Sequence, residues 1–388
     1  SKGRILKTGE SQRKDGRYVY KYTDAGGKPQ FLYSWKLVAT DRLPAGKREC
    51  VPLRDKIREV RKDLDDGIDP IGKKMTVCQL YAKQNSHRKN VRPGTEKGRD
   101  YLMKLLREDP IGSRSIESVK LSDAKEWAIR MSEKGYAFQT IANFKRSLKA
   151  AFYTAVEDDC IRKNPFNFAL NTVLEDDREE KEALTPEQAE SLLAFAKSDR
   201  VYRQYYDELV ILLGTGLRIS ELCGLTTAID FQNRIIDVER QLLWDSDIGY
   251  YTSPPKTKNG IRQIPMTEAV YQALRRTVKN RGKAAPVEID GYKNFLFLKK
   301  DGNPKVKASY ESMLRCLVKK YNKNHEEPLP NITPHTLRHT FCTRMANAGM
   351  NPKALQYIMG HGDISMTLNY YAHATFDSAK AEMERVAA

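Results

Sequence analysis

The chain is poor in the features that build metal clusters, disulfide scaffolds and membrane spans. Its 6 cysteines are scattered without a C-x-x-C pair and without a histidine at ligand spacing, so we expect reduced core thiols. No apolar run approaches the roughly 18 residues of a membrane helix, and no lipidation signal is present, which argues against a membrane partner. The opening stretch, SKGRILKTGESQRKDGR, lacks the apolar part of a secretory signal, so a cytoplasmic location is expected.

Positive charge is what the sequence has in excess. Lys and Arg number 67 against 50 Asp and Glu, which gives a net charge of +17 and a pI near 9.4. Such a balance suits a protein that meets a polyanion, and nucleic acid is the obvious candidate. A length of 388 residues also exceeds what one compact core usually holds, so two or three domains are expected.

The first seventy residues predict a small three-stranded sheet covered by a helix. Strand signals at 17–22 and 31–38 flank a glycine-rich turn, and 51–67 carries apolar residues along one helical face. Together with several tyrosines, the basic residues could let the sheet read a DNA groove, but a solvated sheet over a tyrosine-rich core is also possible. These basic residues are Arg13, Lys14, Arg17, Lys21 and Lys28.

Residues 75–170 indicate a helical domain. Over 138–156 the apolar residues recur at helical spacing, and Lys145, Arg146 and Lys149 are expected to project outward. That basic face could follow DNA phosphates or simply be solvated, and both interpretations stay open.

A dense run of charge predicts an exposed linker over 171–184, after which a third domain begins at Thr185 with a capping box. This domain is expected to be mostly helical, with a small antiparallel sheet from strands at 234–244 and 261–266. Within it, 250–265 is interpreted as a hairpin that turns at Asn-Gly. The fold class expected for the whole chain is therefore multidomain α+β.

One predicted helix, TPHTLRHTFCTRM over 333–345, begins with a cationic cluster. Thr333 can cap its amides, and apolar residues recur at four-residue spacing. His335 and Arg338 lie three apart and are neighbours on the helix surface, and His339 lies one turn beyond His335. Because a helix start already favours anions, the cluster indicates an anion site.

Two other segments hold polar residues in unusual places. ILLGTGLRISEL ends one helix at two glycines and begins another that carries Arg218 and Glu221 on adjacent faces. Glu221 either neutralises a costly arginine or holds its guanidinium so that it grips a phosphate. Lys258, beside the expected Asn-Gly turn, is either a solubility device or a mobile acid that protonates a leaving oxygen.

The last candidate segment is YIMGHGDISMTLNYYAHAT. It sets His361 between two glycines, where the imidazole can reach a ligand, and follows it with Tyr370 and Tyr371. Adjacent residues point roughly 100° apart on a helix, so the two tyrosines cannot both face one site. Each is either a core residue or a nucleophile.

Taken in order, these motifs resemble those of the tyrosine recombinases, the phage-integrase family, over 185–375. The opening sequence and the three-part layout are further similar to the integrases of conjugative transposons. The Tyr-x-His pattern selects Tyr371 as nucleophile, although the shorter spacing of many members would select Tyr370. The matching residues are Arg218, Lys258, His335, Arg338, His361 and Tyr371.

The resemblance implies a transposon integrase, a site-specific recombinase whose tyrosine attacks a DNA phosphorus and leaves a 3′-phosphotyrosyl link. Arg218, Arg338 and His361 would neutralise the developing charge. His335 would accept or orient a proton, and Lys258 would protonate the 5′-oxygen. Integration and excision of a mobile element would then need neither metal nor cofactor, with Glu221 and His339 in supporting places.

The same resemblance implies an arm-type DNA-binding domain at 1–70, a core DNA-binding domain at 75–170 and a catalytic domain at 185–375. A tail helix at 376–388 would dock either on its own domain or on a neighbouring protomer. The expected partners are double-stranded DNA with arm-type and core-type sites, further copies of the chain as a tetramer in the synapse, and an excisionase-like accessory protein.

Two other functions compete with this interpretation. A DNA-binding or architectural protein would keep the residues but form no covalent adduct, and a type IB topoisomerase would relax supercoils without exchanging strands. A zinc protease is disfavoured, because Thr336 stands where the H-x-x-x-H motif of His335 and His339 needs a glutamate and Arg338 would repel the ion.

Overall fold

The computed structural model describes residues 4–24, 27–70, 72–89, 91–177, 183–281, 287–371 and 383–384. The chain divides into two compact units, Ser1–Glu179 and Glu180–Ala388, and each is described by itself. No helix among the described residues is long and apolar enough to cross a membrane.

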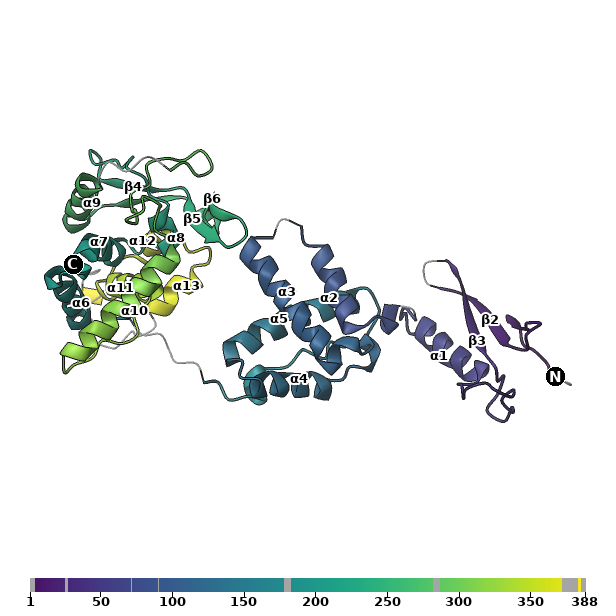
Figure 1. The fold of residues 1–388 in the computed structure, drawn as a ribbon. Coiled ribbons are helices and arrows are strands. Elements are labelled where there is room, and N and C mark those ends of the chain that lie inside the picture. Colours follow the sequence, from purple (N-terminus) through teal and green to yellow (C-terminus); the bar gives the residue numbers. More distant parts are fainter. Residues whose placement is uncertain are drawn as a thin grey trace. The chain divides into compact units, whose positions relative to one another are not determined.

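The first unit begins with the predicted three-stranded sheet, which is confirmed (Figure 1). Strands β1 (Glu10–Gln12), β2 (Tyr18–Thr23) and β3 (Pro29–Ser34) pair antiparallel in chain order. Helix α1 (Leu53–Asp65) packs its apolar stripe against the sheet, where its buried residues meet the rings of β2. The sheet therefore has one face covered by a helix.

The rest of the first unit is helical. Its main helices enclose one core built around Trp127, whose ring packs edge-on against that of Phe166 with their centroids 5.6 Å apart. Thr76 begins helix α2 (Val77–Ser86) with a capping box. Its side chain accepts from the Gln79 amide, and the Gln79 side chain accepts from the Thr76 amide. The helices are α2 (Val77–Ser86), α3 (Pro93–Glu108), α4 (Leu121–Glu133) and α5 (Phe138–Glu157).

The second unit is mostly helical, and the capping box predicted at Thr185 is present. Its helices are α6 (Pro186–Ser198), α7 (Tyr206–Thr215), α8 (Ile219–Cys223), α9 (Glu268–Asn280), α10 (Lys307–Asn324), α11 (Pro334–Asn347), α12 (Pro352–Met359) and α13 (Ser365–Leu368). Helix α7 packs on both α9 and α11, and apolar contacts between these helices form the centre of the unit.

The antiparallel pairing expected between the stretches at 234–244 and 261–266 is present in the second unit, but its other strands differ from the prediction. The stretch expected as one strand at 234–244 forms two, β4 (Ile235–Val238) and β5 (Gln241–Asp245), which belong to different sheets. The expected hairpin at 250–265 is wrong, because β6 (Gly249–Ser253) pairs with β5 and β7 (Arg262–Pro265) pairs with β4. Two consecutive prolines after β6 lack amide protons, so the chain leaves that sheet before it reaches the Asn-Gly turn.

Candidate active site

The turn between α7 and α8 presents the first candidate arginine. Gly216 ends α7 with φ of 61°, and a Cβ built there would lie 2.4 Å from the Phe341 ring, so only glycine fits. Arg218 then begins α8. The Glu221 carboxylate accepts from the Arg218 amide at 3.0 Å and from Arg218 Nη1 at 2.8 Å, while Arg218 Nη2 donates to Gly360 O at 3.1 Å. The expected pairing of Glu221 with Arg218 is therefore present, and 27% of the arginine side chain remains exposed.

Glu221 is buried yet stays ionised, because it also binds a second arginine. Burial alone would raise its pKa, but Arg262 and then Arg218 and Arg338 lower it below the ordinary value. Arg262 Nη2 donates to Glu221 Oε2 at 2.9 Å. One carboxylate is thus shared between Arg218 and a buried arginine that sequence reasoning missed. The alternation of β7, which turns Arg262 and Ile264 inward, was the available signal.

Arg338 lies one turn into α11 and is almost fully buried. Its Nη1 donates to Gly216 O at 2.6 Å, and its Nη2 donates to Met359 O at the end of α12. Burial, followed by the charge of Arg218, lowers the pKa of Arg338 to about 9, so the guanidinium remains charged at neutral pH. The side chain joins the ends of two helices and lies beside Arg218.

His361 follows the left-handed glycine that ends α12. Its Nδ1 lies 2.9 Å from Thr367 Oγ1, and only 4% of the residue is exposed. Burial, followed by the charges of Arg338 and Arg218, lowers the pKa of His361 to about 4. The imidazole is therefore neutral in the DNA-free protein, so it can act as a hydrogen-bond donor rather than as the cation that the sequence suggested. Arg218, Arg338 and His361 together are called the anion site below.

Lys258 lies at a short 3₁₀ turn between β6 and β7, and its side chain is exposed. The turn is fastened to the anion site by its other residues. Thr257 Oγ1 donates to Gly360 O at 3.4 Å, and Asn259 Nδ2 donates to His361 O at 3.2 Å. The backbone therefore brings Lys258 to the edge of the site while leaving its ammonium free to move.

The two histidines of α11 occupy different environments. The helix begins as predicted, with Thr333 accepting from the Thr336 amide at 3.1 Å, and His335 is exposed in its first turn. His339 is partly buried, with its ring centroid 4.8 Å from that of Tyr370. Burial lowers the pKa of His339, which keeps it neutral. Across the described ranges, no three His, Cys, Asp or Glu side chains form a group that could hold a metal ion.

The Tyr371 hydroxyl is hydrogen-bonded to the backbone instead of reaching the anion site, whereas Tyr370 lies close enough to Arg338 for that charge to oppose the rise in its pKa. Tyr371 donates its hydroxyl to Met350 O at 2.5 Å, and both Tyr371 and Tyr370 pack against a small core formed by α11 and α12. Burial and then the nearby Cys342 raise the pKa of each phenol. The Tyr371 hydroxyl is thus hydrogen-bonded to the backbone in the DNA-free protein. Tyr371 follows His361 closely in the sequence.

The predicted DNA-binding residues fall into two groups. Those of the N-terminal sheet are accessible, and the Arg17 guanidinium lies 5.7 Å from the ring of Tyr33. In α5, Arg146 is exposed, but the prediction that Lys145 projects outward is wrong. Lys145 shares the buried face of α5 with Ile141 and Leu148 and donates to Phe168 O, and burial lowers its pKa.

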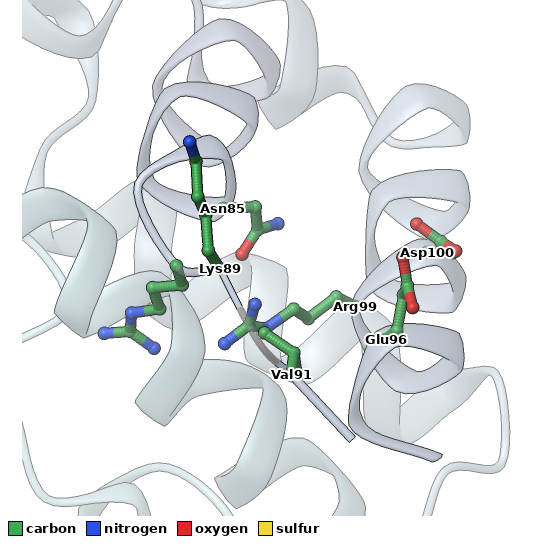
Figure 2. Close-up of a pocket in the computed structure, with 7 residues that line it drawn as sticks. Asn85, Lys89, Val91, Glu96, Arg99 and Asp100 are labelled. Atoms are coloured by element: carbon green, nitrogen blue, oxygen red, sulfur yellow. The ribbon is translucent and has the colours of Figure 1, made fainter. Parts of the chain in front are cut away.

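A basic pocket of about 440 Å³ between α2 and α3 was also missed by sequence reasoning. Figure 2 shows Arg99 reaching from α3 toward the segment that follows α2, while Glu96 and Asp100 stay on α3. Its lining residues come from the end of α2, the segment that follows it and the first half of α3, and they face one another because the two helices pack together. The lining residues are Asn85, Arg88, Lys89, Val91, Glu96, Arg99 and Asp100.

Known proteins share both the sequence and the fold. Residues 182–378 match the phage integrase family, and residues 1–64 match the DNA binding domain of tn916 integrase. The chain is 66% identical to the transposase from transposon Tn1545 of Streptococcus pneumoniae. It is 65% identical to the transposase from transposon Tn916 of Enterococcus faecalis. Both alignments cover 100% of this chain and 96% of the relative.

Solved structures agree with these matches. A Tn1549 transposon integrase in complex with circular intermediate DNA superimposes with a TM-score of 0.77 and 65% identity, covering 80% of this chain and 99% of that one. The fold also matches a lambda integrase dimer bound to a core site, with a TM-score of 0.52 at 15% identity over 96% of each chain. The chain therefore belongs to the phage integrase family and is a site-specific tyrosine recombinase of the transposon-integrase type.

Proposed function

We propose that this recombinase cleaves and rejoins double-stranded DNA through a covalent bond between Tyr371 and a 3′-phosphate, and so integrates and excises a mobile element. The observation that carries the proposal is the convergence, within one unit, of Arg218 from the start of α8, Arg338 from the second turn of α11 and His361 from the segment after α12. The relatives are transposases of Tn1545 and Tn916, and the Tn1549 integrase was solved with circular intermediate DNA.

The chemistry balances with the residues of this chain. The phenolic oxygen of Tyr371 forms a bond to phosphorus, the bond from phosphorus to the 5′-oxygen breaks, and Lys258 supplies the proton that the 5′-oxygen needs. His335 takes or orients the phenolic proton. Arg218 and Arg338 bind the non-bridging oxygens, and His361 donates one hydrogen bond from its neutral ring. Attack by another strand's 5′-hydroxyl then restores the tyrosine.

Tyr371 must leave Met350 before it can react. The hydrogen bond to Met350 O and the raised pKa both keep the phenol protonated at rest. A free phenol with a pKa of about 10 already costs about 4 kcal/mol to ionise at neutral pH. The positive charges of Arg218 and Arg338 offset that cost only after the side chain has moved to them, so we expect this movement to precede cleavage.

The remaining partners are proposed on the family resemblance. Domains at 1–70 and 75–170 would bind arm-type and core-type DNA, and the domain at 185–375 would act as a tetramer in the synapse, inside a bacterial cell and with an excisionase-like protein for excision. No metal is proposed, since fixed cations can stabilise the phosphorane. The tail helix expected at 376–388 lies almost wholly outside the described residues.

A nicked duplex with joined transposon ends tests the proposal, because strand cleavage releases a short fragment and traps the enzyme. We expect a covalent protein–DNA adduct whose modified tryptic peptide contains Tyr371. Salt-sensitive binding without any adduct would instead identify an architectural protein. Relaxation of supercoiled DNA without a recombinant product would identify a topoisomerase.

The pocket between α2 and α3 is expected to bind the DNA backbone. Replacing Arg88 and Arg99 together by alanine should weaken binding and reduce the slope of log affinity against log salt by about 1–2, because each phosphate that the protein no longer neutralises lowers the slope by about 0.9. Titrations at several salt concentrations measure this change. Lys134→Ala, an exposed charge at the end of α4, is the matched control. Equal slopes for the double variant and the wild type would exclude the pocket from the DNA interface.

A further inference from the structure

The side chain of Arg262 is fully enclosed, with 0% of its surface exposed. Its guanidinium donates from three nitrogens to three separate segments. Nε donates to Ile358 O at 2.6 Å, Nη1 to Gly260 O at 2.8 Å and Nη2 to Glu221 Oε2 at 2.9 Å. The Arg262 guanidinium therefore joins three segments, namely the end of α12, the turn between β6 and β7, and α8.

Each of the three segments holds a residue assigned to chemistry under the proposed function. The turn that Arg262 holds through Gly260 begins with Lys258. The end of α12 leads directly to His361. The other carboxylate oxygen of Glu221 accepts a hydrogen bond from Arg218 Nη1 at 2.8 Å. The side chain of Arg262 has no exposed surface with which to touch DNA.

The packing around Arg262 leaves little room for adjustment. A Cβ built on Gly360 would lie 3.0 Å from Asn259 O and 3.1 Å from Arg262 Nη1, and Gly360 has φ of 61°. Asn259 Nδ2 also donates to His361 O at 3.2 Å, which ties the two loops directly. A displacement of the guanidinium therefore shifts both loops together.

No other side chain can replace the arginine here. Its planar fork offers five N–H donors in fixed directions, whereas a lysine ammonium is a single point that cannot reach three acceptors in one plane. Without the fork, Glu221 would lose one of its two cations and would be free to take a second bond from Arg218. Gly260 O and Ile358 O would lose their donor in a buried place.

We propose that Arg262 is a positioning residue that sets the relative places of Arg218, Lys258 and His361 for strand cleavage without touching DNA. The inference rests on the proposed function of the anion site. Arg262 therefore affects the rate of strand cleavage and does not affect the affinity for DNA.

Arg262→Lys tests the inference in the full-length protein. Single-turnover cleavage of the nicked duplex should slow by about 100-fold, the effect of roughly 1 Å of misplacement, while DNA affinity stays within about twofold. Arg276→Lys is the matched control, because Arg276 also binds a carboxylate, Asp207 at 2.6 Å, but on the surface of α9. It should cleave at the wild-type rate.

A substrate with sulfur in place of the bridging 5′-oxygen separates positioning from general damage. A thiol has a pKa of about 8.5, so the sulfur leaves without a proton donor and misplacement of Lys258 no longer matters. With this substrate, we expect the cleavage rate of Arg262→Lys relative to wild type to rise by at least about tenfold. A variant that is only unstable would show no such restoration.

Asn259→Ala provides a second test if Arg262→Lys does not fold, because Asn259 is exposed and ties the same two loops. It should show the same pattern on a smaller scale, with cleavage a few-fold slower and restored by the sulfur substrate. Wild-type cleavage rates in Arg262→Lys, or losses in affinity and cleavage together without restoration, would overturn the inference. Absence of an adduct with the wild-type protein would instead overturn the proposed function.

Discussion

Tyr371→Phe is expected to lower formation of the covalent protein–DNA adduct by at least about 10⁴-fold, because a phenyl ring has no oxygen to bond to phosphorus. DNA affinity should be unchanged. Loss of the hydrogen bond to Met350 O should cost only about 1 kcal/mol of folding stability. The nicked duplex and a denaturing gel measure the adduct, and thermal unfolding measures the stability.

Tyr370→Phe is the matched control for this variant. It makes the same substitution in the neighbouring residue, whose ring packs beside His339. We expect an adduct at near wild-type level. If the adduct instead survives in Tyr371→Phe and disappears in Tyr370→Phe, the nucleophile is Tyr370 and the resting bond to Met350 belongs to a structural tyrosine.

Arg338→Lys is expected to slow single-turnover cleavage by about 10² to 10³-fold, the usual effect of removing one fixed donor from a transition state. The lysine keeps the charge but cannot donate to Gly216 O and Met359 O while also binding phosphate. The rate should not recover with the sulfur-containing substrate, because the lost group acts on the non-bridging oxygens.

Arg344→Lys controls for this substitution on the same helix. Arg344 also donates to a carbonyl of α7, Leu213 O at 2.9 Å, but it lies outside the anion site. Cleavage by this variant should match the wild-type rate. Equal losses at both positions would mean that Arg338 fastens α11 to α7 and does nothing further in the reaction.

Local chemistry explains which parts of the fold could be predicted. The capping box at Thr185 and the N-cap at Thr333 depend on residues three apart, and both are present. Strand pairing in the second unit depends on distant residues, so the expected hairpin at 250–265 was wrong even though its turn residues were favourable. Lys145 was misplaced because its charge was given more weight than its spacing from Ile141 and Leu148.

The residues of the anion site were proposed from the sequence, but their geometry was not. The motifs and the family resemblance singled out Arg218, Arg338 and His361, and the structure places them near one another. The neutral state of His361 follows from burial and from neighbouring guanidinium groups, which no linear pattern reveals. Arg262 went unnoticed because its importance lies in three acceptors that only the folded chain assembles.

Because several guanidinium groups share one carboxylate, the site favours the transition state over the intact phosphodiester. Among the residues that the structure describes, Arg218, Arg262 and Arg338 share the single carboxylate of Glu221, so this part of the DNA-free site holds more positive than negative charge, and the neighbouring arginines contribute to the lowered pKa of Arg338. A phosphodiester brings one negative charge, whereas the five-coordinate phosphorus species brings about two. The net charge of the anion site with its bound DNA is therefore closer to zero in the transition state than with intact DNA. The arginines consequently attract the phosphorus group more strongly as the bonds rearrange.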